Sequence, residues 1–179
     1  LGKLYKVPEK LEDMAFSFKT IQQSAEISLG FPDTYNPDDL SRQFVEGSIL
    51  TADKADLETV KKTLQARQNS GELTINWSQS ADQRKHYFKI EQIKRPLQTA
   101  DFLQVQYDGA AFDSDETNEW TRDLVPQGKF QVVNATVVND DEPRIELIFS
   151  DPLLEMQDLT GLIQVAGTDL PDAVINGHV

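Results

Sequence analysis

Short runs of β-branched and aromatic residues recur along this chain and constrain its fold more than any other feature. Such runs are typical of strands, and turn-forming residues separate them. We expect strands over residues 14–19, 25–31, 44–50, 73–77, 86–92, 102–107, 130–139, 144–149 and 162–165. The sequence therefore predicts a mainly β protein of the Ig-like, antiparallel β-sandwich class.

The run HYFKIEQ, residues 86–92, shows how one strand would be oriented. Successive side chains of a strand point to opposite faces of its sheet. One face would carry His86, Phe88, Ile90 and Gln92, and the other Tyr87, Lys89 and Glu91. We expect the face with Phe88 and Ile90 to be turned toward the core, which is the half-buried pattern of antiparallel sheets.

The stretch from residue 145 to 165, IELIFSDPLLEMQDLTGLIQV, stops one strand and soon starts another. An Asp-Pro step at Asp151 disfavours helix and removes a backbone donor, so a strand over 145–149 should end there. An irregular crossing would then lead to the strand over 162–165, as where a sandwich strand changes sheet. Upstream, the polar residues 139–143 predict the turn of a hairpin.

One segment favours a helix instead. Between residues 51 and 71, Leu57, Val60 and Leu64 fall on one helical face, acidic residues precede them and Gly71 follows. We expect one inserted α-helix over about residues 54–69, with its Lys- and Arg-bearing side in solvent.

A change of composition over residues 113–128, rich in acidic residues and with Pro126 and Gly128, is typical of a domain junction. We expect one β-sandwich domain over residues 12–122 and the start of a second over 126–179. The second would be truncated, because its strands are too few for a sandwich of about seven. The first residue, Leu1, indicates a piece of a longer protein.

Composition excludes several functional classes. The formal net charge of −13 would repel phosphate backbones, so nucleic acid is not an expected partner. No apolar stretch reaches the roughly 20 residues needed to cross a bilayer. The absence of cysteine excludes thiol nucleophiles, disulfides and thiolate metal sites within these residues. No glycine-rich phosphate loop occurs either.

The two histidines, His86 and His178, give little basis for catalysis. A Ser-His-Asp arrangement needs a histidine base beside a nucleophile. His86 falls inside an expected strand and His178 at the end of the chain, so a structural or surface role is favoured for both. Transition-metal sites normally recruit several such side chains. We predict no catalytic, cofactor-binding or metal-binding residues and no cofactor.

Carboxylates and tryptophans leave weaker alternatives open. Asp113, Asp115 and Glu119 could supply oxygen ligands to calcium, although EF-hand spacing is missing and a solvated acidic linker is the simpler interpretation. The adjacent pairs at 38–39 and 140–141 fall in expected loops, where solvent keeps carboxylates ionised. Trp77 and Trp120 could stack on sugars, but tryptophan in such strands is more often part of a sandwich core.

Several motifs resemble one protein family. The stretch FSDPLLEMQDLTGLIQV is similar to the motif that opens an early domain of bacterial alpha-2-macroglobulins, through Phe149, Ser150, Asp151, Pro152, Leu153, Gln157, Asp158, Leu159, Gly161, Leu162 and Ile163. Residues 16–21, 38–56, 73–77 and 86–95 resemble the amino-terminal macroglobulin-like domain of the Bacteroides-type members.

The resemblance implies a non-catalytic, structural amino-terminal region of a large protease inhibitor. Such a protein would be extracytoplasmic, in the periplasm or at the cell surface, and held by a lipid anchor outside these residues. Its partners would be other domains of the same polypeptide and, through the whole protein, target proteases. The family's thioester needs a cysteine, so that chemistry is not implied for any residue of this chain.

Two other functions stay open. One is an extracellular adhesion or glycan-binding β-sandwich module, for which exposed Trp or Tyr residues on one sheet would be expected. The other is an accessory domain of a hydrolase whose catalysis takes place elsewhere in the polypeptide.

Overall fold

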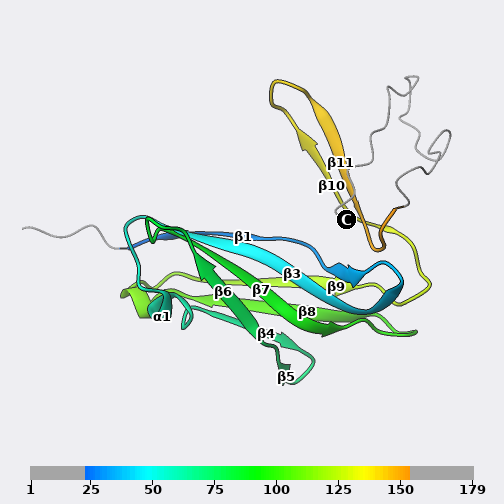
Figure 1. Ribbon diagram of the computed structural model, residues 1–179, viewed down its shortest axis with the longest axis horizontal. Helices are drawn as coiled ribbons and strands as arrows, with labels where there is room; N and C mark the ends of the chain where they lie inside the picture. Colours follow the sequence, from blue (N-terminus) through cyan, green and yellow to red (C-terminus); the bar gives the residue numbers. More distant parts are fainter. Residues whose placement is uncertain (1–22, 154–179) are drawn as a thin grey trace, which may run out of the picture.

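The computed structural model describes residues 23–153, which form a mainly β structure with two packed antiparallel sheets and a separate hairpin (Figure 1). Sheet A has the strand order β1-β3-β7-β6, with β2 paired to β3. Its strands are β1 (Ala25–Leu29), β2 (Asp33–Asn36), β3 (Asp39–Thr51), β6 (Ile75–Gln79) and β7 (Lys85–Lys94).

Sheet B packs against sheet A and has the order β5-β4-β8-β9. Its strands are β4 (Leu64–Gln68), β5 (Gly71–Glu72), β8 (Asp101–Asp108) and β9 (Thr117–Leu124). The short 3-10 helix η2 (Gly109–Phe112) connects β8 to β9. These two sheets confirm the predicted antiparallel β-sandwich.

Alternating side chains build the core between the sheets. In β7, His86, Phe88 and Ile90 are buried while Lys85 and Tyr87 are exposed, which confirms the predicted orientation of this strand. After a bulge at Gln92, whose φ is +58°, Ile93 is buried in its turn. Sheet B contributes Leu103, Val105 and Tyr107 from β8.

Gly47 shows how closely the core is packed. It lies opposite Phe88 in the β3–β7 pair. A Cβ at this position would lie 2.2 Å from Phe88 Cζ and 2.5 Å from the Ser28 carbonyl oxygen. Only glycine therefore lets the Phe88 ring lie flat over β3, where it also contacts Trp77 with 5.4 Å between ring centroids.

One edge of the sandwich is closed by Arg122 of β9. Its guanidinium donates to the carbonyl oxygens of Leu29 and Gly30 at 3.2 and 3.1 Å, and it lies over the ring of Phe31. These bonds satisfy the carbonyls of the last residue of β1 and of the residue after it, and they fix sheet B to sheet A at this edge.

The predicted helix over residues 54–69 is wrong for most of its length. Helix α1 covers only Leu57–Val60, with Asp56 as its N-cap, and the chain returns to a strand at Leu64. Leu64 and Ala66 are buried while Gln65 and Arg67 point outward, so Leu64 fits both the helical spacing from Leu57 and the alternation of a strand. Pairing of β4 with β8 completes sheet B, and this tertiary gain outweighs helix propensity.

The predicted acidic junction over residues 113–128 also needs correction. Residues Thr117–Leu124 form β9, which pairs with β8 along its whole length from Asp108↔Thr117 to Asp101↔Leu124. β9 is exposed on one face, so its acidic and polar residues stay in solvent while Trp120 and Leu124 face the core. Within this stretch, residues 113–116 and the segment after Leu124 are irregular.

Other expected strands shift by a few residues. The strand expected over 73–77 is β6, which begins at Ile75 and ends at Gln79, and the strand expected over 44–50 is part of the longer β3. The expected strands over residues 14–19 and 162–165 lie outside the described residues.

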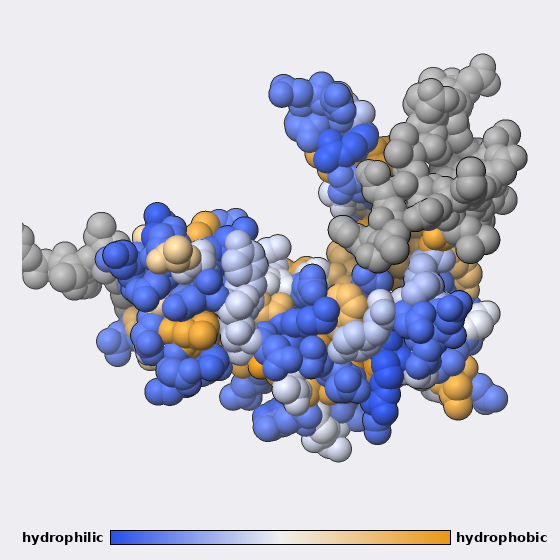
Figure 2. Space-filling view, viewed as in Figure 1, coloured by the Kyte–Doolittle hydropathy of each residue, from blue (hydrophilic) through white to orange (hydrophobic). Residues whose placement is uncertain are grey.

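The hairpin consists of β10 (Val132–Val138) and β11 (Arg144–Phe149), and it projects from one end of the sandwich (Figure 1). The register Val137↔Ile145, Ala135↔Leu147 and Val132↔Phe149 places these six apolar residues on one side, the apolar hairpin face. Val137 is 67% exposed and Ile145 57% exposed. In the view of Figure 2, hydrophilic residues predominate on both the sandwich and the hairpin, with scattered hydrophobic residues between them.

Candidate functional site

His86 is part of the sandwich core. Its side chain is fully buried beside Ile49, and neither ring nitrogen has a hydrogen-bond partner among the described residues. Burial lowers its pKa, an effect that the Gln83 backbone and the charge of Asp82 oppose. His86 therefore belongs to the packed interior between the two sheets. His178 lies outside the described residues.

The acidic residues weighed as calcium ligands are spread over different elements. Asp113 ends η2 with a left-handed backbone, whereas Glu119 points outward from β9. Within residues 23–153, no group of three or more acidic or histidine side chains is arranged to hold a metal ion. Of the two acidic pairs, Asp140 forms an ion pair with Arg144 at the hairpin turn, with 2.7 Å between Oδ2 and the guanidinium.

Both tryptophans pack against the core, as predicted. Trp77 of β6 and Trp120 of β9 are half-buried and contact the buried cluster. Trp77 lies opposite Phe88 and Trp120 opposite Val105, so both are on the core side of their sheets rather than on the outer faces.

The best-defined polar arrangement is the junction between the sandwich and the hairpin, and it centres on Arg95. This residue follows β7, and its side chain has no exposed surface. Its guanidinium donates to Asp151 Oδ1 at 2.6 Å and to Asp151 Oδ2 at 2.9 Å. Two further bonds reach the carbonyl oxygens of Val125 and Pro126, at 2.8 and 3.3 Å.

This geometry links three segments through one side chain: the end of β7, the connection after β9 and the residues after β11. A planar guanidinium that binds a carboxylate through two bonds gives both strength and a defined orientation. Backbone bonds reinforce the same contact, since Gln127 N–H donates to Pro96 O at 2.8 Å. The connection is thereby fixed to the sandwich.

Asp151 and Ser150 complete the junction on the hairpin side. Burial raises the pKa of Asp151, but hydrogen bonds from Arg95 and Ser150 and the charge of Arg95 outweigh it and hold that pKa below its usual value. Ser150 N–H donates to Gln131 O at 2.9 Å, and Gln131 N–H donates to Ser150 Oγ at 3.1 Å. The Ser-Asp step thus closes the hairpin and supplies its charged contact.

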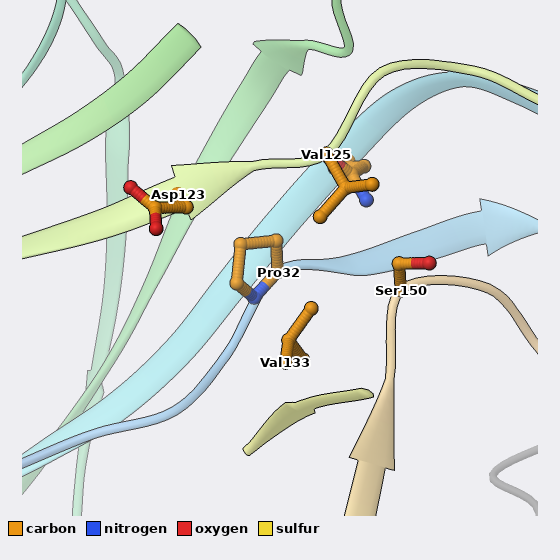
Figure 3. Close-up of a pocket in the computed structure, with 6 residues that line it drawn as sticks. Pro32, Asp123, Val125, Val133 and Ser150 are labelled. Carbon is orange, nitrogen blue, oxygen red and sulfur yellow. The ribbon is translucent and has the colours of Figure 1, made fainter. Parts of the chain in front are cut away.

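A small cavity of about 10 Å³ lies at this junction, lined by Pro32, Gln43, Asp123, Val125, Val133 and Ser150. Figure 3 shows Val133 directed from the hairpin toward Pro32 of the sandwich. Val133 is the extra residue of a β-bulge between Val132 and Asn134, which re-aims its side chain out of the hairpin register. A space of this size holds about one water molecule, so it is a packing feature of an interface rather than a ligand site.

Sequence reasoning did not find Arg95 or assign a role to Asp151. Arg95 stands in an ordinary strand-ending run, IKRP, where a charged residue is expected in solvent. Its partner is 56 residues away in the chain, so no local pattern connects the two. The only signal was the Ser-Asp-Pro step after β11, which predicted the end of the strand but not the ion pair.

Comparison of the chain with protein-family models, with curated proteins and with solved structures gave no match. Among residues 23–153, no helix is long and apolar enough to cross a membrane.

Proposed function

We propose that this chain is a non-catalytic structural region at the amino-terminal side of a large cell-envelope protease inhibitor of the alpha-2-macroglobulin type. In this role the sandwich is a spacer that sets the direction of the module after it. The motifs quoted above support the family, and the architecture of the junction supports the role.

The observation that carries this proposal is the Arg95–Asp151 pair. A simple flexible linker would not require a guanidinium with no exposed surface, bound to a carboxylate that is only 16% exposed. Buried ion pairs contribute little net stability compared with apolar packing. We infer that this pair instead sets the geometry of the junction. A fixed angle between consecutive modules is what a scaffold of tandem sandwiches needs.

The apolar hairpin face supports a second module. A two-stranded hairpin is marginal in water by itself, and its apolar side normally packs on another layer. We therefore propose that residues 126–179 begin a second macroglobulin-like sandwich, with β10 and β11 as its first two strands. Its partners in this arrangement are other domains of the same polypeptide.

The remaining parts of the proposal follow from the family resemblance. The whole protein would meet target proteases outside the cytoplasm, in the periplasm or at the cell surface. A lipid anchor outside these residues would be its membrane attachment. The chain itself would need no cofactor, and its net charge of −13 does not suit nucleic acid.

A protease assay tests the proposal directly. The 179-residue chain is mixed with serine, cysteine and metalloproteases at increasing molar ratios, and residual activity on a protein substrate is measured. We expect no inhibition, because a spacer carries no trapping chemistry. Stoichiometric loss of activity of any protease would overturn the spacer role.

The orientation function is tested separately by small-angle scattering of the wild-type chain and the Arg95→Gln variant. We expect the variant to show a broader distribution of distances, because the hairpin loses its charged contact with the sandwich. Arg144→Gln, which removes an exposed arginine at the hairpin tip, is the matched control and should leave the distribution unchanged. Identical distributions for wild type and Arg95→Gln would contradict a clamped junction.

A further inference from the structure

The outer face of sheet A carries an exposed aromatic cluster that the spacer role does not explain. Tyr87 of β7 is 45% exposed and Tyr35 of β2 is 42% exposed. Both belong to the same sheet, with Phe44 beside Tyr35 at 4.9 Å between ring centroids. Lys89 Nζ lies 3.6 Å from the centroid of Phe44, which places these aromatic rings on the outward side with Lys89.

A shallow groove of about 410 Å³ crosses this face over β3, β7 and β6, and we call it the sheet A groove. Its side-chain lining is Glu46, Asn76, Ser78, Tyr87 and Lys89. The same groove is bounded by Gly47, Trp77 and Phe88, whose positions in the register alternate with these outward residues. Its volume is within the range of about 300–1,000 Å³ found for small-molecule sites.

Tyr87 is the aromatic residue among the outward side chains that line the groove. Lys85 places its ammonium 5.2 Å from the centroid of that ring, and Lys85 does not line the groove. Lys89, which is two residues after Tyr87 on the same outward side of β7, does line the groove. Tyr87 is 45% exposed and lines the groove, so a ligand there would contact its ring.

The polar groups of the groove are unpaired or mutually neutralised. Asn76 and Ser78 are exposed, and neither side chain has a hydrogen bond to any residue in the described range 23–153. Lys89 and Glu46 form an ion pair at 3.0 Å, so their charges cancel locally. The side chains that line the groove thus offer both hydrogen-bond donors and hydrogen-bond acceptors, and their charges sum to zero.

We propose that the sheet A groove binds a neutral oligosaccharide. The apolar C–H face of a sugar ring stacks on an exposed aromatic side chain, while its hydroxyl groups need donors and acceptors together. Tyr87 supplies the ring, and Asn76, Ser78 and the Glu46–Lys89 pair supply the polar contacts. The net charge of −13 disfavours sulfated and uronic-acid glycans, which selects the neutral class.

The experiment uses the intact 179-residue chain on an array of neutral cello-, malto-, manno- and chito-oligosaccharides with sulfated and uronate oligosaccharides beside them. Hits are measured by isothermal titration calorimetry, and the contact surface is mapped by NMR shift perturbation. We expect binding to at least one neutral class, with shifts confined to β3, β6 and β7. No binding to any neutral oligosaccharide at millimolar concentration would overturn the proposal, as would binding to anionic glycans alone.

Variants locate the site. Tyr87→Ala should weaken binding about tenfold, which corresponds to about 1.4 kcal/mol. Asn76→Ala should weaken binding to a smaller extent. Tyr87→Phe should keep most of the affinity because the ring remains. Phe102→Ala is the matched control, since Phe102 is 42% exposed on sheet B and its loss should change nothing. Equal affinity for wild type and Tyr87→Ala would overturn the site. The site would also be overturned if added extended peptides caused NMR shifts at β6 while no sugar did. A folded far-UV spectrum is required of each variant, and Tyr87→Phe gives a second test with minimal structural change.

Discussion

The sandwich and the hairpin are built from the same kind of alternating strand, but only the sandwich buries its apolar side. Ile90 in β7 is completely buried, whereas Ile145 in β11 is 57% exposed. The difference lies in the second layer: sheet B covers sheet A, and no described element covers the apolar hairpin face. A strand's pattern therefore states which side should be buried, but not what will bury it.

The two regions also differ in how their charged groups are used. Ion pairs on the sandwich surface, such as Lys89–Glu46, are partly in solvent, whereas Arg95–Asp151 at the junction is almost entirely removed from it. The attachment of the hairpin therefore centres on a buried polar contact, whereas the sandwich is held together by buried apolar area. The following predictions test this contrast, from the largest expected effect to the smallest.

Truncation of matched isoleucines should separate the two regions most strongly. Ile90→Ala leaves a cavity in the core and should lower the free energy of unfolding by about 2–5 kcal/mol in urea denaturation. Ile145→Ala removes a side chain that is 57% exposed and should change it by less than about 0.5 kcal/mol. Comparable losses in both variants would mean that the apolar hairpin face is covered in solution.

Removal of the charge of Asp151 should detach the hairpin without unfolding the sandwich. Asp151→Asn leaves the fully buried Arg95 guanidinium without a counter-charge, and breaking such a pair costs about 3–5 kcal/mol. We expect faster amide hydrogen exchange in β10 and β11 and unchanged exchange in β7 and β8. Asp140→Asn at the exposed hairpin turn is the control. If it accelerates exchange as much as Asp151→Asn does, the junction is not the dominant contact.

Glycine substitutions distinguish packing limits from backbone limits. Gly47→Ala would press a methyl group against Phe88 and the Ser28 carbonyl, and overpacking of this kind costs about 1–3 kcal/mol. Gly128→Ala, in the connection to the hairpin, has open space but a φ of +75°, so its cost of about 1 kcal/mol would be conformational. Gly71→Ala, whose nearest contact is an ordinary 3.6 Å, should have the smallest effect in thermal or urea unfolding. A silent Gly47→Ala would show that the Phe88 ring can move.

Acidification should affect the two regions in different pH ranges. Burial lowers the pKa of His86 in the folded chain below its ordinary value of 6.5, so the unfolded state binds a proton first as pH falls. Stability contributed by neutral His86 is therefore complete above pH 6.5 and declines on acidification below it. In His86→Leu this part of the pH dependence should disappear from urea unfolding curves measured between pH 7 and pH 5.

The junction should respond only at lower pH. The folded pKa of Asp151 is held below its ordinary value of 3.8, so its contribution is complete above that value and is lost as pH falls through the folded pKa. Exchange of hairpin amides should accelerate in this lower range. Loss of hairpin protection already near pH 6, with the sandwich intact, would contradict this assignment.

Much of the fold could be predicted where one face of a strand is clearly apolar. The orientation of β7 and the bounds of β11 follow from alternation and from the Asp-Pro step. The helix over residues 54–69 could not be rejected, because Leu57, Val60 and Leu64 satisfy a helical spacing and Leu64 and Ala66 a strand spacing. Only pairing with β8 decides between them. The sequence did not predict β9, because an edge strand with one solvated face has the composition of a loop.

The candidate sites were less predictable than the fold. An exposed tyrosine on one sheet was expected for a glycan-binding module, but no single strand reveals that Tyr35, Tyr87 and the Glu46–Lys89 pair share one face. Likewise, the partner of Arg95 is separated from it by 56 residues. Both arrangements arise from pairing between strands, which brings distant residues together.

The amino-acid sequence by itself determined that this chain forms short amphipathic strands, that it has no thiol chemistry and that acidic charge dominates it. The tertiary structure alone decided which strands form a closed core, where the hairpin is attached and which aromatic side chains stay in solvent. The physical reason is that alternation and turn chemistry are local, acting within a few residues. Burial, ion pairing and groove formation depend instead on contacts between segments whose separation along the chain carries no pattern.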